Sequence, residues 1–258
     1  MPENLLTILI PLRLAEPSPL EIISLDQTIK VLHKYPITFM APMTLDTTWY
    51  ENYCQGKIEA HVERFDWQGS QAFAELQLDA HFYQRFLAYK YMLICHLDAF
   101  VFRDEVEKWC SMDYDYIGSV IYNPRWVLKN DLKRKLTGFS PPEYFGNGGF
   151  ALKKISSFYH ITSKYRWYLQ FNFWLRKKRG QGLLDDIFLT QHFPKLTTFK
   201  MPPRALAEKF GAAYEVWDAD KLPFTNQDDS TLPFGIHAWI QLNQDYWKPS
   251  IRRAGHAI

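Results

Sequence analysis

The chain has 258 residues, 47% of them hydrophobic and 22% charged, which is an ordinary globular balance for one large or two small domains. Thirty basic and 28 acidic residues leave a formal charge of +2, which excludes the strong field of a nucleic-acid-binding protein. No apolar run approaches the ~20 residues that span a bilayer, so an integral membrane protein is excluded as well.

The first half of the chain alternates short apolar runs with amphipathic stretches, which is typical of a mainly parallel α/β sheet. Strands are predicted at residues 5–12, 37–42 and 60–65. Ser18 and Glu21 form a capping box, with Pro19 at the first helical position, and predict a helix to about Lys34. Apolar residues at helical spacing predict a second helix over 76–89.

The next run, LICHLDAFVF (residues 93–102), resembles a buried central strand but carries Asp98 in its middle. A buried carboxylate without a partner is costly, so Asp98 should end the strand or have a strong partner. Ligands of open α/β sheets bind beyond the carboxyl ends of the strands, which favours a functional role. Capping the next helix is an equal alternative.

The following segments are predicted from caps and periodicity. Asp104 can cap a helix that ends near Cys110, and 114–120 returns to the sheet. Residues 122–145 are expected to form a long loop, which is often functional. The remaining expectations are a long aromatic helix at 155–175, a helix from Asp185, and short strands and turns from Thr197 on.

The sequence FGNGGF contains Gly146, Asn147, Gly148 and Gly149. Glycines permit positive φ and close backbone approach, so this segment can cradle a phosphate or a sugar. A plain hairpin turn is the favoured alternative, because Asn-Gly is a strong turn signal.

Three further positions carry ionisable groups or an aromatic ring. Asp185 and Asp186 are adjacent, and their repulsion raises one pKa as a general base requires, although carboxylates also favour a helix N-terminus. His237 is either a core residue or a metal ligand. Trp239 can stack on a sugar.

The order of these features resembles the GT-A class of nucleotide-sugar glycosyltransferases, which has an Asp-x-Asp motif, a glycine-rich loop, an x-Glu-Asp motif and a late histidine. "FYQRFLAYKYMLICHLDAFVF", "GNGGFALKK" and "DDIFLT" are also similar to a GT-A-like family known as a domain of unknown function, over roughly residues 5–240. The resemblance implies one Rossmann-like α/β domain over 1–258, with a mixed, mainly parallel central sheet between helices. Its nucleotide-binding half would be about 1–120 and its acceptor-binding half about 121–258.

For the donor, the resemblance implies that Asp98 matches the first aspartate of Asp-x-Asp. Phe100 then stands where the second carboxylate is expected. A Mn²⁺ or Mg²⁺ ion would rely on Asp98 and His237, with His96 on the same face. A metal-independent enzyme would instead use basic side chains, and the candidates are Arg125, Lys129, Lys133, Arg134, Lys248, Arg252 and Arg253.

For the acceptor, the resemblance implies that Asp185 takes the place of the glutamate and Asp186 that of the catalytic aspartate. Asp186 would remove the proton of the attacking hydroxyl, with inversion at the anomeric carbon. Residues 146–149, with Trp239, would line the sugar side of the cleft. By the same analogy, the nucleotide would lie against Pro11, Leu12 and Arg13.

We therefore expect a glycosyltransferase that moves a sugar from a nucleotide-sugar to a glycan or glycolipid hydroxyl, as in polysaccharide biosynthesis. Two alternatives stay open: an inactive GT-A-like module that binds a glycan or nucleotide, and a hydrolase with Asp98, Asp185, Asp186 and His237 as metal ligands. The unpaired cysteines and the absence of a signal-peptide pattern predict a cytoplasmic protein. The basic end of the aromatic helix is ordinary cap chemistry or, as the alternative, a peripheral membrane surface.

Overall fold

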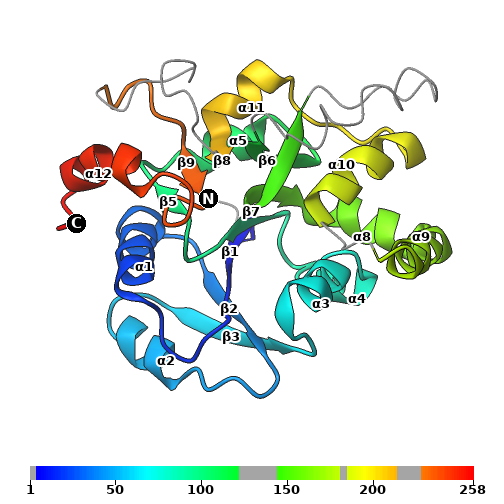
Figure 1. Cartoon of the computed structure of the whole chain (residues 1–258), viewed down its shortest axis with the longest axis horizontal. Helices are drawn as coiled ribbons and strands as arrows, with labels where there is room; N and C mark the ends of the chain where they lie inside the picture. Colours follow the sequence, from blue (N-terminus) through cyan, green and yellow to red (C-terminus); the bar gives the residue numbers. More distant parts are fainter. Residues whose placement is uncertain (1–3, 122–143, 181–184, 214–227) are drawn as a thin grey trace.

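The computed structural model describes residues 4–121, 144–180, 185–213 and 228–258. These form one nine-stranded sheet in the order β3-β2-β1-β4-β7-β6-β8-β9-β5, with helices packed around it (Figure 1). The strands are β1 (Leu6–Pro11), β2 (Ile37–Pro42), β3 (Ala60–Phe65), β4 (Tyr91–Cys95), β5 (Phe100–Val101), β6 (Tyr116–Ile121), β7 (Phe145–Lys154), β8 (Gly211–Ala213) and β9 (Gly235–His237). The helices are α1 (Pro19–Leu32), α2 (Thr48–Cys54), α3 (Gly69–Leu76), α4 (Ala80–Gln84), α5 (Val106–Ser111), α8 (Ile155–Lys164), α9 (Arg166–Lys178), α10 (Asp185–Leu196), α11 (Arg204–Phe210) and α12 (Gln244–Arg253).

The first four strands of the sheet, β3-β2-β1-β4, are all parallel, as the alternating sequence pattern predicts. The predicted strands in this half are confirmed, and so is the capping box: the Glu21 N–H bonds to the Ser18 hydroxyl, and the Ser18 N–H bonds to the Glu21 carboxylate. Because the four strands run in one direction, their carboxyl ends meet at one edge of the sheet.

Strand β7 is antiparallel to both β4 and β6, with Cys95 opposite Phe150. The start of β7 therefore lies at the edge where β4 ends. The glycine-rich run occupies that start, so it is a strand segment and neither a hairpin turn nor a loop. The pairing of β6 with β7 shifts register between Gly118 and Ser119, which leaves this part of β7 irregular.

The sheet is buried on both faces because its strands alternate between two apolar cores. Ile8 and Ile10 of β1 pack with α1, α2 and α5, whereas Leu9 between them packs on the opposite side. There it joins the aromatic residues of α4, α8 and α10. A third cluster joins β5, β9 and α12.

Several predicted boundaries are wrong for local reasons. The helix predicted over 76–89 is two short helices, because Asp79 caps α4 through the His81 N–H. The aromatic helix predicted over 155–175 breaks at Tyr165 into α8 and α9. The last third contains helices α11 and α12 as well as short strands.

The strand predicted through Asp98 ends at Cys95, and residues 96–99 form a turn before β5. Only four residues separate β4 from β5, yet the two strands are fourth and ninth in the sheet order. The sheet thus curls back toward this turn. No helix in the described part of the chain is long and apolar enough to cross a membrane.

Candidate active site

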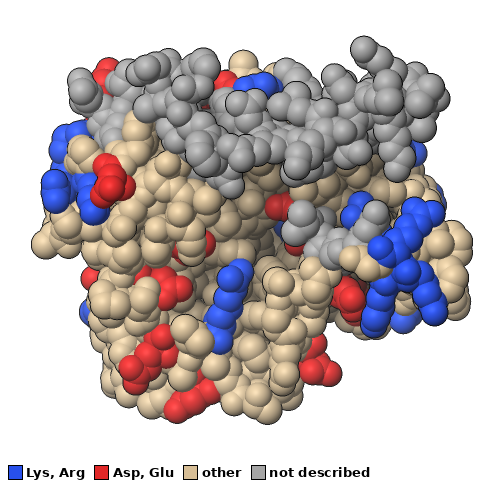
Figure 2. All heavy atoms as spheres, viewed as in Figure 1, with Lys and Arg blue, Asp and Glu red and all other residues tan. Residues whose placement is uncertain are grey.

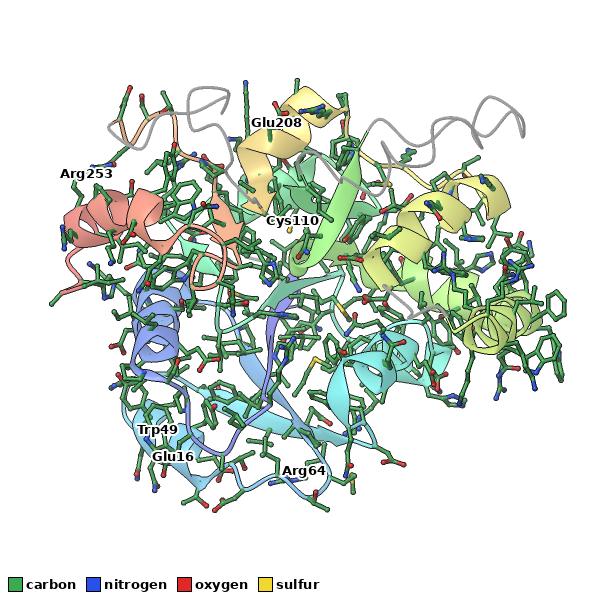
Figure 3. All side chains as sticks on the ribbon, in the orientation of Figure 1. Glu16, Trp49, Arg64, Cys110, Glu208 and Arg253 are labelled. Atoms are coloured by element: carbon green, nitrogen blue, oxygen red, sulfur yellow. The ribbon has the colours of Figure 1, made fainter. Side chains whose placement is uncertain are left out.

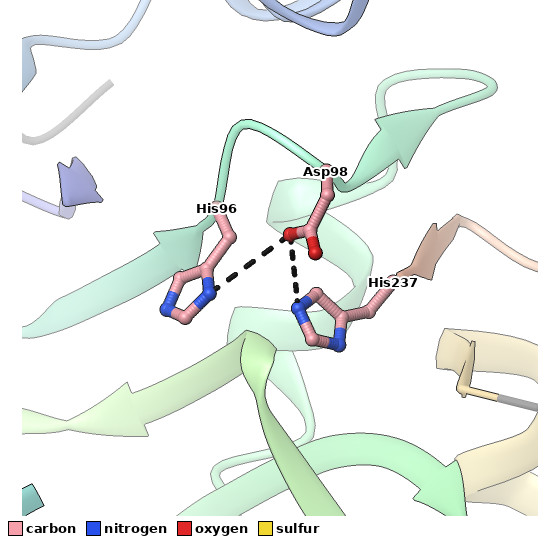
Figure 4. Close-up of side chains that lie close together, drawn as sticks. All are labelled: His96, Asp98 and His237. Atoms are coloured by element: carbon pink, nitrogen blue, oxygen red, sulfur yellow. Dashed lines mark ion pairs between the residues drawn. The ribbon is translucent and has the colours of Figure 1, made fainter. Parts of the chain in front are cut away.

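A cluster of His96, Asp98 and His237 lies where β4 ends and β9 ends (Figure 4). Nε2 of His237 is 3.1 Å from Oδ1 of Asp98, and Nδ1 of His96 is 4.0 Å from the same oxygen. The candidate ligand atoms of all three side chains lie within 4.8 Å of one another. The structure therefore joins the two predicted metal ligands and adds His96 to them.

The contacts within this cluster are close without being hydrogen-bonded. Nε2 of His96 and both ring nitrogens of His237 are buried and have no hydrogen-bond partner among the described residues. Buried polar atoms are normally satisfied, so three orphaned nitrogens around one carboxylate indicate a missing partner. Adjacent ligands of one metal ion lie about 3 Å apart for bonds of about 2.1 Å, so the cluster fits a divalent cation.

The charge states also suit a cation site. Burial lowers the pKa of His96 to about 3, helped by the positive His237, so His96 is neutral and can donate a lone pair. Burial works to raise the pKa of Asp98, but the neighbouring histidines outweigh it and hold this pKa well below its ordinary value. A neutral imidazole and an ionised carboxylate are the forms that bind metal.

The pair of residues that faces the site is His96 and Asp98, and this corrects the predicted register. Phe100 is fully buried among Phe102, Trp239 and His256, so its side chain points into the core of the small β5–β9 layer. A carboxylate at this position would be buried away from the cluster. The motif is thus His-x-Asp, with Asp98 second.

The glycines of β7 support the site through close packing. A Cβ on Gly149 would overlap the ring of His237 at Nε2. At Gly148 the same atom would meet the acidic pair at an ordinary 3.6 Å. Neither glycine has a positive φ, so close approach is the reason for glycine here. Gly146 packs against the Tyr116 ring instead.

The acidic pair opens α10 and lies across Gly148 from the cluster. The N–H of Gly148 donates to Oδ2 of Asp186 at 3.2 Å, and the N–H of Ile187 donates to Oδ1 at 2.7 Å. Burial raises the pKa of both carboxyls, and that of Asp185 is raised further by Asp186. His237 opposes the rise at Asp186, which identifies Asp186 as the carboxylate nearer the cluster.

Lys153 lies behind the acidic pair, and the sequence prediction missed it. Its side chain is fully buried on β7, where Nζ donates to Oε1 of Gln77 at 2.5 Å and to the Tyr83 hydroxyl at 3.4 Å. Burial lowers the pKa of Lys153, while the two carboxylates raise it. The sequence signal was a lysine pair inside the apolar strand FALKK.

Two cavities open at the same edge, on either side of Arg13. The first is about 320 Å³ and reaches Pro11, Asp98 and His96, and it also includes Gln241 from the C-terminal segment. The second is about 530 Å³ and is bounded by the ends of β2 and β3 and the start of α3. Figure 2 shows this face hollowed near its centre, with acidic and basic side chains around the hollow.

The walls of the second cavity are fixed. Arg64 (Figure 3) donates from Nη1 to the carbonyl oxygen of Leu45 at 2.7 Å and from Nη2 to the hydroxyl of Thr47 at 3.0 Å. These bonds hold the loop after β2. Trp67, 4% exposed, also lines this cavity, and its buried indole N–H has no partner in the described part of the molecule.

Other predicted site residues lie elsewhere. Leu12 is fully buried in the core, so the expectation that its side chain meets the nucleotide is wrong. The sugar-stacking role of Trp239 is wrong as well, because its ring is 0% exposed and its Nε1 donates to the Ser24 hydroxyl.

Most of the basic alternatives also lie away from the site. Lys248, Arg252 and Arg253 on α12 bond to Asp245, Ile258 and Asp229 respectively, and none of them lines the two cavities at the carboxyl edge. Arg125, Lys129, Lys133 and Arg134 lie outside the described residues.

Comparisons with known proteins support the fold. Mouse xyloside xylosyltransferase 1 in its apo form is similar over 91% of this chain and 97% of its own, with a TM-score of 0.54 and 12% identity. Core-mannan synthase A from Aspergillus fumigatus matches 59% of this chain and 60% of its own, with a TM-score of 0.39 and 11% identity. No curated protein matches by sequence. Residues 57–237 match the family described as "Protein of unknown function (DUF5672)".

Proposed function

We propose, for a chain that belongs to the DUF5672 family and has a GT-A glycosyltransferase-like fold, that it transfers a sugar from a nucleotide-sugar donor to a hydroxyl group. One observation carries the proposal. A cation-type cluster and a raised-pKa acidic pair lie on opposite sides of Gly148–Gly149 at the carboxyl edge of the sheet. The first suits a leaving diphosphate and the second an attacking hydroxyl.

The donor would bind along the two cavities that flank Arg13. The guanidinium can pair with phosphate, since arginine presents several donors in a rigid fork. Trp67 offers an unpartnered N–H and an aromatic edge to a base or ribose in the second cavity. Pro11 lines the first cavity, and with Arg13 it keeps part of the role that the resemblance implies for the end of β1.

His96, Asp98 and His237 would hold a divalent cation. When bound, such an ion neutralises the charge that develops on the leaving diphosphate. Two imidazoles and one carboxylate are softer than the oxygen set that Mg²⁺ prefers, so the residues favour Mn²⁺.

Asp186 would act as the general base for the acceptor. Its raised pKa brings the carboxylate closer to neutral pH, where base catalysis is most efficient. A single base opposite the leaving group gives in-line displacement, so we propose an inverting reaction. The acceptor would be a glycan or a lipid-linked sugar, bound by the acceptor half of one domain over 1–258, beside Asn147 and Gly148.

The proposal is tested by a thermal-shift screen of nucleoside diphosphates and nucleotide-sugars, with and without Mn²⁺. A ligand at about 100 times its Kd stabilises the native state by about 2.7 kcal/mol, so a real donor gives a clear shift. Nucleotide release that depends on an acceptor supports transfer. Release without acceptor indicates a hydrolase, and ligand binding without turnover indicates a binding module. No shift with any nucleotide would refute the donor site.

Gly149→Ala should weaken Mn²⁺ binding about tenfold, because the new methyl group displaces a supporting contact of a ligand. Titration calorimetry with Mn²⁺ measures the effect. Gly148→Ala is the matched control: its methyl meets the acidic pair at 3.6 Å, so Mn²⁺ affinity should stay within about twofold. Equal affinities for the two variants would contradict the assignment of His237 as a ligand.

A further inference from the structure

Helix α9 exposes a row of large aromatic side chains. Trp167 is 84% exposed, Phe171 57% and Trp174 53%, whereas Leu169 is the buried residue of the helix. Positions i, i+4 and i+7 lie on one face of a helix, so the three rings form a single stripe. The rings of Phe171 and Trp174 stack with centroids 6.0 Å apart. We call these three residues the aromatic stripe.

The charge around the aromatic stripe has one sign. Residues 155–184 contain no Asp or Glu and six basic residues, namely Lys164, Arg166, Arg176, Lys177, Lys178 and Arg179. Arg176 turns inward over the Phe188 ring, and the remainder can face solvent. Figure 2 shows the basic cluster at the side of the molecule where Figure 1 has α9.

Helix capping explains only part of this surface. Gly180 has φ +63° and its N–H bonds to the carbonyl oxygen of Lys177, which is ordinary C-terminal chemistry. Basic residues in the last turn also suit the helix dipole. Neither effect requires Trp167, Phe171 and Trp174 to project into water, which costs hydrophobic free energy.

We propose that α9 is a docking surface for a membrane that contains anionic lipids. Exposed aromatic rings flanked by basic residues are the composition of helices that lie in the bilayer interface. A second copy of this chain is disfavoured as the occupant, because two such faces would bring basic clusters together. The stripe also projects outward, and a soft surface accepts projecting rings where a protein partner would need a matching groove.

Membrane binding does not depend on the proposed function, but it would serve that function. Only residues 179–184 separate the end of α9 from Asp185, so the docking surface and the acidic pair are close along the chain. A membrane held at α9 would favour a lipid-linked sugar as the acceptor. That choice of acceptor rests on the proposed function, whereas vesicle binding is measured without it.

Vesicle flotation with the full chain tests the proposal. Vesicles of phosphatidylcholine alone are compared with vesicles that also contain about 30% phosphatidylglycerol. The chain should bind the anionic vesicles at least about tenfold more tightly, and added salt should weaken the binding. Absence of binding to anionic vesicles at low salt would overturn the proposal, and would leave an acidic protein as the partner.

Variants then locate the surface. The triple variant Trp167→Ser, Phe171→Ser, Trp174→Ser should bind anionic vesicles at least about tenfold more weakly with an unchanged melting temperature. The double variant Met43→Ser, Leu87→Ser removes two other exposed apolar side chains, 58% and 45% exposed, and should bind like the wild type. Equal binding by the triple variant would overturn the assignment to α9. A concentration-dependent dimer that the triple variant abolishes, without vesicle binding, would do the same.

Discussion

Asp186→Asn should lower kcat for sugar transfer about a thousandfold, because general-base catalysis contributes about a hundred- to ten-thousandfold and an amide cannot take the proton. Donor binding should survive, since the cation cluster and both cavities lie on the other side of Gly148. Transfer is measured as nucleotide release with acceptor, and donor binding as a thermal shift.

The geometry at Asp186 also predicts a limited loss of stability. Its two carboxylate oxygens accept the N–H groups of Gly148 and Ile187, and an asparagine can accept only one of them. The free energy of unfolding should therefore fall by about 1–2 kcal/mol. A loss of this size leaves the native state populated in the assay, so the fall in kcat reports chemistry.

Asp185→Asn provides the comparison for this prediction. Asp185 lies in the field of Lys153 and lacks the influence of His237 that marks Asp186, so its effect should be indirect. We expect a loss of about tenfold in kcat, smaller than that of Asp186→Asn. A larger loss for Asp185→Asn would transfer the role of base to Asp185, and near-normal turnover of Asp186→Asn would exclude both the base and the inverting reaction built on it.

The sequence was sufficient for the parallel half of the fold because its signals there are local. The capping box at Ser18 and the apolar runs of β1 to β3 determine elements without help from distant residues. The helix break at Asp79 is also local, but apolar periodicity continued through the break and hid it. The short strands β5, β8 and β9 have two or three residues each, and their pairing depends on the whole sheet.

The candidate site was predicted as separate motifs, and its register was wrong for a tertiary reason. Period-two alternation places His96, Asp98 and Phe100 on one face of a regular strand. The turn at 96–99 breaks that alternation and sends Phe100 into the core, where Trp239 lies as well. Lys153 escaped notice because its partners, Gln77 and Tyr83, are about 70 residues away in the chain.

Lys153→Met should move the acid limb of the pH–rate profile to higher pH by about one unit or more. Lys153 lowers the pKa of Asp185 and of Asp186, so its removal raises both pKa values. A carboxyl with a raised pKa is protonated, and inactive as a base, over a wider range at low pH. Activity at pH 7 should therefore fall about 10- to 100-fold and recover at higher pH.

The other groups around the pair do not titrate in this window. Burial raises the pKa of Tyr83 on α4 and of Tyr116 on β6 well above the ordinary tyrosine value, so both stay neutral. His237 on β9 is the other charge that acts on Asp186, and the substitution leaves it in place. A shift of the acid limb then reports Lys153.

Stability should respond differently from activity. Burying an ammonium group costs several kcal/mol, and Lys153 recovers this through Gln77, Tyr83 and the acidic pair. Methionine fills a similar volume without that cost, so the free energy of unfolding should change by less than about 2 kcal/mol. Lys153→Gln keeps a donor for Gln77 and removes the charge, so it should show the same pH shift.

Lys154→Met is the matched control for this prediction. Lys154 is the next residue on β7 but pairs with Asp113 at 2.8 Å, away from the acidic pair. Its removal should leave the pH–rate profile unchanged. An unshifted acid limb in both Lys153 variants would mean that the lysine only fills the core. A shift that high pH reverses would mean that a buried cation sets the pH at which the acidic pair can accept a proton.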